Sequence, residues 1–390
     1  MEPRVAVVGV GHAGFAAIAA GVSYKELMFE AAQRAAFDAG IDPRSEVDSF
    51  VCCSEDFLEG TSIFDEYVPD QLGAAQRPVH TVAGDGLLGV ATGIMLIRSG
   101  IAQVVAVEAH SKASDIVTLG QIEAFALDPV WNRPLGLSTA AVAGLDMNAF
   151  LERTGLTEEH CAMVVAKNRR NALDNPRAAY PADLDLGQVD DSAPVSWPLR
   201  ELEVAAPADG CVVAILAAED RARDLTEGPV WVLGAGWSSG AASLESRAWG
   251  EADGVALAAQ MAFRQVGIRD PAEEIDLAEV DDTYAYRELQ HLEALGLATA
   301  EELAELLEEG ELEADGALPV NVSGGALGSG DLFEANGLAR LQECVEQLRG
   351  EAGERQVDEV YTAVAQSWLG VPSTTGAVVV LANDEGAGGG

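Results

Sequence analysis

Short apolar segments alternate with longer segments of helical periodicity, and this alternation occurs twice along the chain. Residues 3–11 (PRVAVVGVG) and 228–236 (GPVWVLGAG) are both rich in β-branched residues and end in Gly-x-Gly. In each case the apolar residues that follow recur at helical spacing, over 27–41 and over 256–268. Each predicted helix then leads through acidic residues to a further apolar strand. The pattern predicts an α/β protein with two similar βαβ-rich halves.

The region between these repeats has a less regular pattern, which indicates an insertion. Residues 111–199 combine one capped helical pattern with a long loop-rich stretch, and we predict an inserted loop domain there. We assign 1–110 together with about 200–227 to the first half, and 228–383 to the second. The last residues, 384–390, have low complexity, and we expect them to be disordered.

The chain is strongly acidic. Its 390 residues include 23 Lys and Arg against 64 Asp and Glu, a formal net charge of −41 at pH 7. Such a charge repels phosphate backbones and anionic lipid headgroups, so we expect no nucleic-acid or membrane partner. Acidic residues spread along the whole chain are typical of adaptation to high salt, where their charge is screened. An acidic enzyme of a mesophile is the alternative interpretation.

Sequence signals for a membrane span, a metal or a cofactor are weak. The longest apolar run, 86–97, is too short to cross a bilayer, and the first residues lack the features of a signal peptide. The five cysteines have no Cys-x-x-Cys spacing, which argues against a disulfide framework and a zinc site. Residues 9–14 fit Gly-x-Gly-x-x-Gly, but no acidic residue follows at the spacing that binds a ribose. We expect a cytoplasmic protein without metal or bound cofactor.

Residues 79–100 form a strand, a glycine-rich turn and an apolar run that predicts a buried helix. Such a turn can present a nucleophile at a helix N-terminus, where the helix dipole lowers the pKa of a thiol. The segment resembles the thiolase superfamily, whose turn usually reads Cys-Gly/Ala-Ser-Gly before an apolar helix that ends in Ser/Thr-Gly. Alignment back from Ser99-Gly100 places the family's nucleophilic cysteine at Ala83, which is followed by Gly84, Asp85 and Gly86.

Further segments resemble the archaeal and sterol-carrier-protein branch of the thiolases. Residues 155–178 and 194–216 are similar to its loop domain, 279–297 to its Asn/His-Asp-x-Phe segment, and 318–341 to its PVN-SGG…GHPxGATG segment. The resemblance covers nearly the full length. It implies a duplicated α-β-α-β-α layered fold with two five-stranded mixed-sheet halves, an inserted loop domain, and a homodimer that acts on acyl-CoA.

The residues at the family's catalytic positions differ from the family pattern. Asp281 stands where that branch has a histidine, and Asp331 replaces the histidine of Gly-His-Pro. Residues 363–381 contain neither Cys nor His. Thiolysis needs a thiolate that carries an acyl group and a second base, and Ala83 can supply neither.

The resemblance places carboxylates and phenols in the pocket instead. We expect these side chains to converge from three loops, where close carboxylates shift each other's pKa and can act as acid and base: Asp85, Asp281, Asp331, Tyr284 and Tyr286. The alternative is that Asp281 and Asp331 only cap turns. By the same resemblance the acyl-CoA pocket includes Ser323, Gly325 and Gly330.

These residues leave three functional interpretations open. The first is aldolase-type carbon–carbon bond chemistry on a β-hydroxyacyl-CoA, with an Asp and Tyr pair as base and donor. The second is a catalytically silent subunit that binds acyl-CoA and supports a small zinc-ribbon and OB-fold partner or an active thiolase homologue. The third is an acetyltransferase in which another residue replaces the cysteine.

Overall fold

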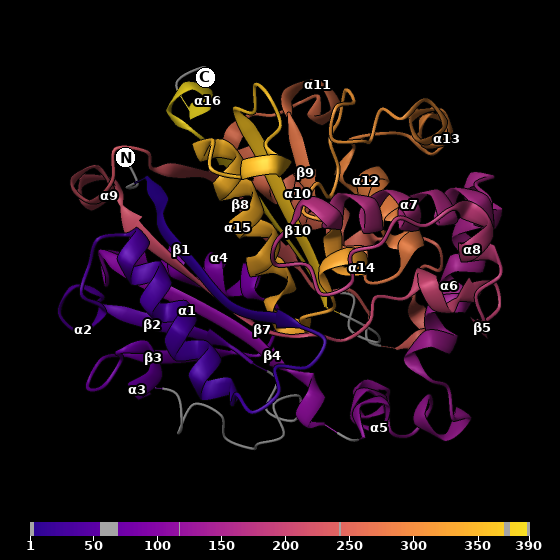
Figure 1. Cartoon of the computed structure of the whole chain (residues 1–390), viewed down its shortest axis with the longest axis horizontal. Coiled ribbons are helices and arrows are strands. Elements are labelled where there is room, and N and C mark those ends of the chain that lie inside the picture. The colour runs from indigo at the N-terminus through magenta and orange to yellow at the C-terminus, as the bar shows by residue number, and fades with distance from the viewer. Residues whose placement is uncertain (1–3, 55–68, 117, 242, 370–374, 388–390) are drawn as a thin grey trace.

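The computed structural model of the chain describes residues 4–54, 69–116, 118–241, 243–369 and 375–387. The strands of the main sheet are β1 (Val5–Ala16), β2 (Ser49–Cys53), β3 (Val79–Val82), β4 (Val104–Lys112), β7 (Asp209–Ala218), β8 (Val230–Ser238), β9 (Leu277–Glu279), β10 (Thr362–Leu369) and β11 (Thr375–Ala382). In the described residues they form one nine-stranded sheet in the order β3-β2-β4-β7-β1-β8-β11-β10-β9 (Figure 1). Two short strands, β5 (Pro194–Ser196) and β6 (Leu199–Arg200), pair with each other.

The two ends of this sheet follow the same plan. Outward from β1, two antiparallel pairings lead through β7 to β4, and two parallel pairings lead on to β2 and β3. Outward from β8, two antiparallel pairings lead through β11 to β10, and a parallel pairing leads to β9. The predicted duplication, with β1 and β8 as equivalent first strands, is therefore confirmed. The expectation of five strands in each half is wrong for the second, which has four strands among the described residues. A parallel bridge from Ala278 to Val320 lies where the first half has its fifth strand.

Helix α1 (Tyr24–Asp38) shows why the first strand ends in Gly-x-Gly. The helix begins at a capping box of Ser23 and Glu26 and packs its alanines against β1. A Cβ on Gly11 would lie 2.2 Å from the backbone nitrogen of Ala35, closer than any side chain allows. The glycines of this motif therefore allow the helix to pack closely on the strand, because they have no side chain to separate the two backbones.

Helix α10 (Asp253–Val266) repeats this arrangement on β8. A Cβ on Gly236 would lie 2.0 Å from the carbonyl oxygen of Ala258 in α10. The repeated Gly-x-Gly of the sequence is thus explained by the same strand-to-helix contact in each half. This contact accounts for the dinucleotide-like pattern at residues 9–14 without a bound nucleotide.

Helices α4 (Gly86–Arg98) and α15 (Asn336–Arg349) lie against the sheet and contact each other near their N-termini. A Cβ on Gly86 would lie 2.4 Å from Cγ of Leu338, so the two helices approach closely. Both helices are largely buried, as predicted for the apolar run at 86–97. The loops around these N-termini form the centre of the predicted site.

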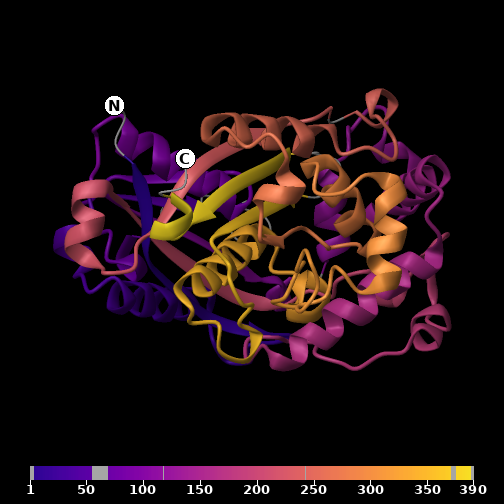
Figure 2. The same ribbon diagram turned by 90° about the horizontal axis from the view of Figure 1, so that it is seen from above.

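The remaining helices surround this core. They are α2 (Pro43–Glu46), α3 (Pro69–Leu72), α5 (Leu119–Glu123), α6 (Thr139–Thr154), α7 (Glu158–Asn171), α8 (Leu186–Asp190), α9 (Glu219–Leu225), α11 (Pro271–Glu274), α12 (Ala285–Leu295), α13 (Ala300–Glu309), α14 (Gly325–Ser329) and α16 (Asp384–Ala387). Helices α6, α7 and α8 gather at the end of the molecule away from α9 and the N-terminus (Figures 1 and 2). Their apolar side chains share one core with α12, in which Phe150 lies near Tyr286 and Leu289.

The predicted disorder of the tail is wrong for its first residues. Residues 384–387 form α16, which contacts β8 and β11. The indole Nε1 of Trp231 donates to Oδ1 of Asp384 at 2.7 Å, and this bond fixes the helical turn. Residues 388–390, and the turn 370–374 within the segment 363–381, lie outside the described residues. None of the described helices is long and apolar enough to cross a membrane.

Candidate functional site

The segment 204–208 brings Tyr284 and Asp331 together. Val204 forms an antiparallel bridge with Tyr284, and Pro207 forms a parallel bridge with Asp331. The backbone nitrogen of Asp331 donates to the carbonyl of Ala206 at 2.8 Å, and the nitrogen of Ala208 donates back to Asp331 at 2.9 Å. Two loops that are distant in sequence thus both pair with the segment 204–208. The convergence of the two side chains stays a prediction.

Asp331 has the features of an acid–base group. Its side chain is half-buried, and Oδ1 accepts from the nitrogen of Phe333 at 3.0 Å and from Nδ2 of Asn336 at 2.7 Å. Burial raises the pKa of Asp331 to about 6, against the lowering effect of these two hydrogen bonds, and the charges of Asp281 and Glu123 raise it further. Among the described residues, the hydrogen bonds to this side chain all end on Oδ1. A carboxyl group with a pKa near neutrality is suited to proton transfer.

Tyr284 is almost fully buried, and its pKa depends on this burial and on nearby polar groups. Burial raises the pKa of Tyr284, a hydrogen bond with the Thr139 side chain lowers it, and the charges of Glu123 and Asp331 raise it. The Thr139 hydroxyl also donates to Oε2 of Glu123 at 2.9 Å. Thr139 begins α6 and Glu123 ends α5, and both are partly exposed. The sequence contained no motif that marked either residue, because both come from the irregular insertion.

Asp85, in contrast, is fixed as a cap of two helices. Its Oδ1 accepts from the nitrogen of Leu87 in α4 at 2.8 Å, and its Oδ2 accepts from the nitrogen of Gly337 in α15 at 2.9 Å. Burial raises the pKa of Asp85 to about 6, while Ser367, the Leu87 nitrogen and the charge of Arg340 oppose the shift. Both carboxylate oxygens are used in these caps. The structure therefore gives Asp85 a role in joining the two halves.

Asp281 forms an ion pair in the interior. Its Oδ2 lies 2.9 Å from Nη2 of Arg340, and its carboxylate also accepts from the backbone nitrogen and hydroxyl of Thr283. Both Asp281 and Arg340 are almost fully buried. Asp281 is close enough to Asp331 to raise the pKa of that residue. The turn-capping alternative thus accounts for the contacts of Asp281 with Thr283. It does not include the ion pair of Asp281 with Arg340.

Tyr286 points away from this group. Its hydroxyl donates to Oδ2 of Asp146 at 3.2 Å within the core of the second half. The rings of Tyr284 and Tyr286 lie 6.3 Å apart. The side chain of Tyr286 is fully buried, so its expected convergence with Asp331 is not seen.

Ser323, Gly325 and Gly330, expected in an acyl-CoA pocket, line one small cavity. Its volume is about 20 Å³, which is space for one water molecule. Ser323 Oγ donates to Oε2 of Glu279 at 2.6 Å, and a Cβ on Gly325 would lie 2.1 Å from Asp282. A Cβ on Gly330 would lie 2.4 Å from the Cβ of Ala208. These contacts explain the three residues by packing.

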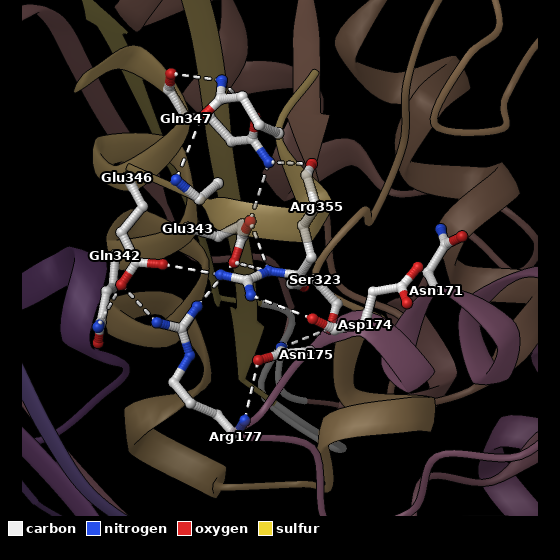
Figure 3. Close-up of polar contacts among 12 residues, drawn as sticks. Asn171, Asp174, Asn175, Arg177, Ser323, Gln342, Glu343, Glu346, Gln347 and Arg355 are labelled. Carbon is white, nitrogen blue, oxygen red and sulfur yellow. Dashed lines mark hydrogen bonds and ion pairs between the residues drawn. The ribbon is translucent and has the colours of Figure 1, made fainter. Parts of the chain in front are cut away.

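Arg177, which lines this cavity, belongs to a buried network of charges (Figure 3). Arg177 bonds to Glu343 at 2.7 Å and to Glu346, while Arg355 bonds to the same two carboxylates at 3.1 and 2.8 Å. Two arginines thus neutralise two glutamates, which a buried network requires. Asn175 Nδ2 donates to the carbonyl of Ser323 at 2.7 Å, so the loop after α7 is tied to both α15 and the cavity.

The thiols of the chain do not reach this site. All five cysteines are buried, and burial raises the pKa of the Cys53, Cys161, Cys211 and Cys344 thiols well above their usual value. A buried thiol with a raised pKa is a poor nucleophile. Ala83 is exposed between β3 and the cap at Asp85.

Comparison with known proteins agrees with this fold and with the sequence resemblance. Residues 235–383 match the family described as Thiolase C-terminal domain-like. The acetyl-CoA acetyltransferase of Methanothermobacter thermautotrophicus is 32% identical over 91% of this chain and 93% of its own length. Human sterol carrier protein 2 is 31% identical over 97% of this chain and 71% of its length.

A solved structure extends the likeness to three dimensions. The Ltp2-ChsH2(DUF35) aldolase superposes with a TM-score of 0.85 at 26% identity, and the match covers 98% of each chain. Full-length similarity in sequence and in fold leads to one assignment. The chain belongs to the thiolase superfamily, in the branch of the archaeal acetyl-CoA acetyltransferases and the sterol carrier protein 2 thiolases.

Proposed function

We propose that the chain is an aldolase-type enzyme that cleaves or forms a carbon–carbon bond in a β-hydroxyacyl-CoA, without a covalent acyl-enzyme. The observation that carries the proposal is the half-buried Asp331, with a pKa of about 6, on a loop that pairs with the same segment, 204–208, as the loop of Tyr284. By the family resemblance, Asp331 takes the place of the histidine of Gly-His-Pro and Ala83 that of the cysteine. On this alignment an acid–base group is kept at the histidine position, while the thiolate of the cysteine position is absent.

The two side chains divide the work of a retro-aldol cleavage. Asp331 accepts the proton of the substrate's β-hydroxyl, for which Oδ2 is the oxygen that its own loop does not use. The Cα–Cβ bond then breaks, a carbonyl forms at Cβ, and the electron pair passes to the enolate of the acyl-CoA. Tyr284 donates its phenol proton toward the enolate, which stabilises the developing charge and completes the acyl-CoA product. No group is transferred to the protein.

Similarity to an aldolase complex supports both this chemistry and a protein partner. The Ltp2-ChsH2(DUF35) aldolase is a complex of a chain similar to this one with a second protein. We propose that this chain forms a homodimer, binds acyl-CoA, and assembles with a small zinc-ribbon and OB-fold partner. The acyl-CoA would approach the rim formed by Tyr284 and Asp331, because the cavity at Ser323 admits about one water molecule.

The test is a product assay on the purified chain, alone and with its candidate partner, using β-hydroxyacyl-CoA substrates of different acyl groups. Asp331→Asn and Tyr284→Phe should each lower kcat by a factor of about 100 or more, since each removes one proton-transfer group. Asp183→Asn and Tyr361→Phe make the same chemical changes at solvent-accessible positions and should keep full activity. Full activity of the Asp331 and Tyr284 variants would contradict the assignment.

A catalytically silent acyl-CoA-binding subunit is the second candidate. It is favoured by the structural use of Asp85 and Asp281, whose carboxylates are taken up by helix caps and by Arg340. In that case the purified chain binds CoA and increases the activity of a thiolase homologue or partner, while turning over no β-hydroxyacyl-CoA. The same assay therefore separates the two candidates.

A further inference from the structure

The loop that carries Asp331 is closed by the side chain of Asn336, the first residue of α15. Nδ2 of Asn336 donates to Oδ1 of Asp331 at 2.7 Å, and the backbone nitrogen of Leu332 donates to Oδ1 of Asn336 at 2.8 Å. The backbone nitrogen of Phe333 also donates to Oδ1 of Asp331, at 3.0 Å. One oxygen of Asp331 thus accepts two hydrogen bonds, and the amide of Asn336 is used at both its oxygen and its nitrogen.

These contacts allow only one orientation of the Asn336 amide. A side-chain amide has one accepting oxygen and one donating NH2 group. If the two were exchanged, the oxygen would face the carboxylate of Asp331 and the NH2 group would face the N–H of Leu332, so both hydrogen bonds would be lost. Asn336 is only 7% exposed, so water has little access to these groups. The direction from which Asp331 is held is therefore fixed by the fold.

The backbone of this loop has a conformation that its neighbours must impose. Phe333 has a φ of 51°, in the left-handed region that is unfavourable for a residue with a bulky side chain. Such a conformation persists where surrounding contacts determine it. Asn336 supplies one such contact from a buried helix whose next residue, Gly337, donates to Oδ2 of Asp85 at 2.9 Å. The loop is thus anchored to the joint between the two halves.

Asn336 also favours the ionised form of Asp331. Burial raises the pKa of Asp331 to about 6, and the hydrogen bonds from Phe333 and Asn336 lower it. The segment 204–208, which pairs with this loop, contains no ionisable side chain. The titratable groups around the loop are two carboxyl groups whose charges raise the pKa of Asp331, a phenol whose own pKa Asp331 raises, and a phenol beside Gly330, in that order Asp281 and Glu123, Tyr284, and Tyr180.

We propose that Asn336 is a positioning residue that orients the Asp331 carboxylate so that Oδ2 faces the β-hydroxyl of the substrate. This inference rests on the proposed aldolase function. During cleavage the β-hydroxyl proton passes to Oδ2, while Oδ1 keeps its two hydrogen bonds in both the ionised and the protonated state. The loop therefore need not rearrange between the two states. When the carbon–carbon bond forms in the reverse direction, the proton returns from Oδ2 to the new hydroxyl.

The decisive variants are Asn336→Ala and Asn336→Asp in the full chain, with turnover of a β-hydroxyacyl-CoA measured as a function of pH. Both remove the donor to Oδ1 of Asp331, but Asn336→Asp keeps the shape of the side chain and an acceptor for the N–H of Leu332. Each should lower kcat by about 10-fold at high pH, where Asp331 is ionised, because the carboxylate is no longer held in one orientation. KM should change by less than about 3-fold, since Asn336 is not assigned a contact with the substrate.

The acid limb of the pH–rate profile gives a second readout. Loss of a hydrogen bond to the charged form raises the pKa of Asp331, so the limb should move to higher pH by about 1 in Asn336→Ala. It should move further in Asn336→Asp, because a second carboxylate then lies beside the first. Asn148→Ala and Asn148→Asp make the same changes at a partly exposed position of α6 and should leave kcat and the limb unchanged.

The outcomes separate this inference from the function on which it rests. A high-pH kcat within about 2-fold of that of the unaltered chain would overturn the positioning role and leave the aldolase proposal in place. A lowered kcat with an unmoved acid limb in both variants would also overturn it, since a purely structural role has that result. If Asn336→Ala loses native circular dichroism, Asn336→Asp decides the question. Absence of turnover by the unaltered chain, with and without its partner, for every β-hydroxyacyl-CoA tested would overturn both proposals.

Discussion

Replacing Asp85 with asparagine probes the joint between the two halves. The wild-type carboxylate accepts from the nitrogens of Leu87 and Gly337, one in each of the helices α4 and α15. Asparagine has one acceptor oxygen, so one of these buried N–H groups loses its partner. Such a loss costs about 1–3 kcal/mol of the free energy of unfolding, and this cost is nearly independent of pH.

The substitution also has a pH-dependent effect on the free energy of unfolding, and this effect favours the variant. Burial raises the pKa of Asp85 from 3.8 to about 6. Below about pH 3 the folded and unfolded chains both hold the proton. As the pH rises toward 6 the unfolded chain loses it first, which lowers the free energy of unfolding by about 3 kcal/mol in total. About 2 kcal/mol of this change falls between pH 4.5 and 7.5. Asparagine does not titrate, so the free energy of unfolding of the variant does not undergo this decrease.

The assay is urea unfolding at pH 4.5 and 7.5 at constant high salt, followed by circular dichroism. The free energy of unfolding of Asp85→Asn, relative to wild type, should rise by about 2 kcal/mol between the two pH values. Asp183→Asn, at an exposed position, should show a constant difference. A difference for Asp85→Asn that stays constant within about 0.5 kcal/mol would refute the assignment of a raised pKa to this double cap.

Four further outcomes follow from the fold and the charge. The melting temperature should rise with salt, because the screening length falls from about 10 Å at 0.1 M to about 3 Å at 1 M and the net charge is −41; an unchanged melting curve would contradict adaptation to high salt. Light scattering should give a dimer that pairs through residues 76–82, since β3 is the sheet edge, and a monomer with native circular dichroism would refute it. Incubation with acetyl-CoA should leave the intact mass unchanged, and an acetylated cysteine peptide would overturn the non-covalent mechanism. Gly11→Val should cost several kcal/mol in a urea titration, because its side chain would collide with the backbone of α1, whereas Gly228→Val, where no atom lies within 4 Å of the added Cβ, should cost less.

The repeated strands could be recognised in the sequence because periodicity is a local property. The equivalence of β1 and β8 follows from two β-branched runs that each end in Gly-x-Gly before a helix. The reason for those glycines could not be predicted, since the backbone atoms of Ala35 and Ala258 that exclude a Cβ belong to other elements. The helical turn at 384–387 was missed for the same reason, because it depends on a bond from Trp231.

The candidate site was predictable only in part. The resemblance to the family placed Tyr284 and Asp331 on two loops, and in the structure both loops pair with the segment 204–208. It gave no sign of Thr139 or Glu123, whose contact depends on how the irregular insertion folds back. A helix N-terminus needs a cap as readily as it can position a nucleophile, so the sequence alone could not separate these two roles for Asp85.

The contrast between Asp281 and Asp331 shows how burial decides which carboxylate can do chemistry. Asp281 is fully buried, and an ionised carboxylate there requires a compensating charge, which Arg340 supplies at 2.9 Å. Transfer of a proton to Asp281 would remove the nearer of the two carboxylates that pair with the buried guanidinium, the other being Asp282 at 3.6 Å. Asp331 does not depend on a buried cation in this way, because it is half-buried and its hydrogen bonds within the loop end on one oxygen. The two aspartates therefore differ in their surroundings, and Asp331, nearer the surface, is the one to which the proposed aldolase mechanism assigns proton transfer.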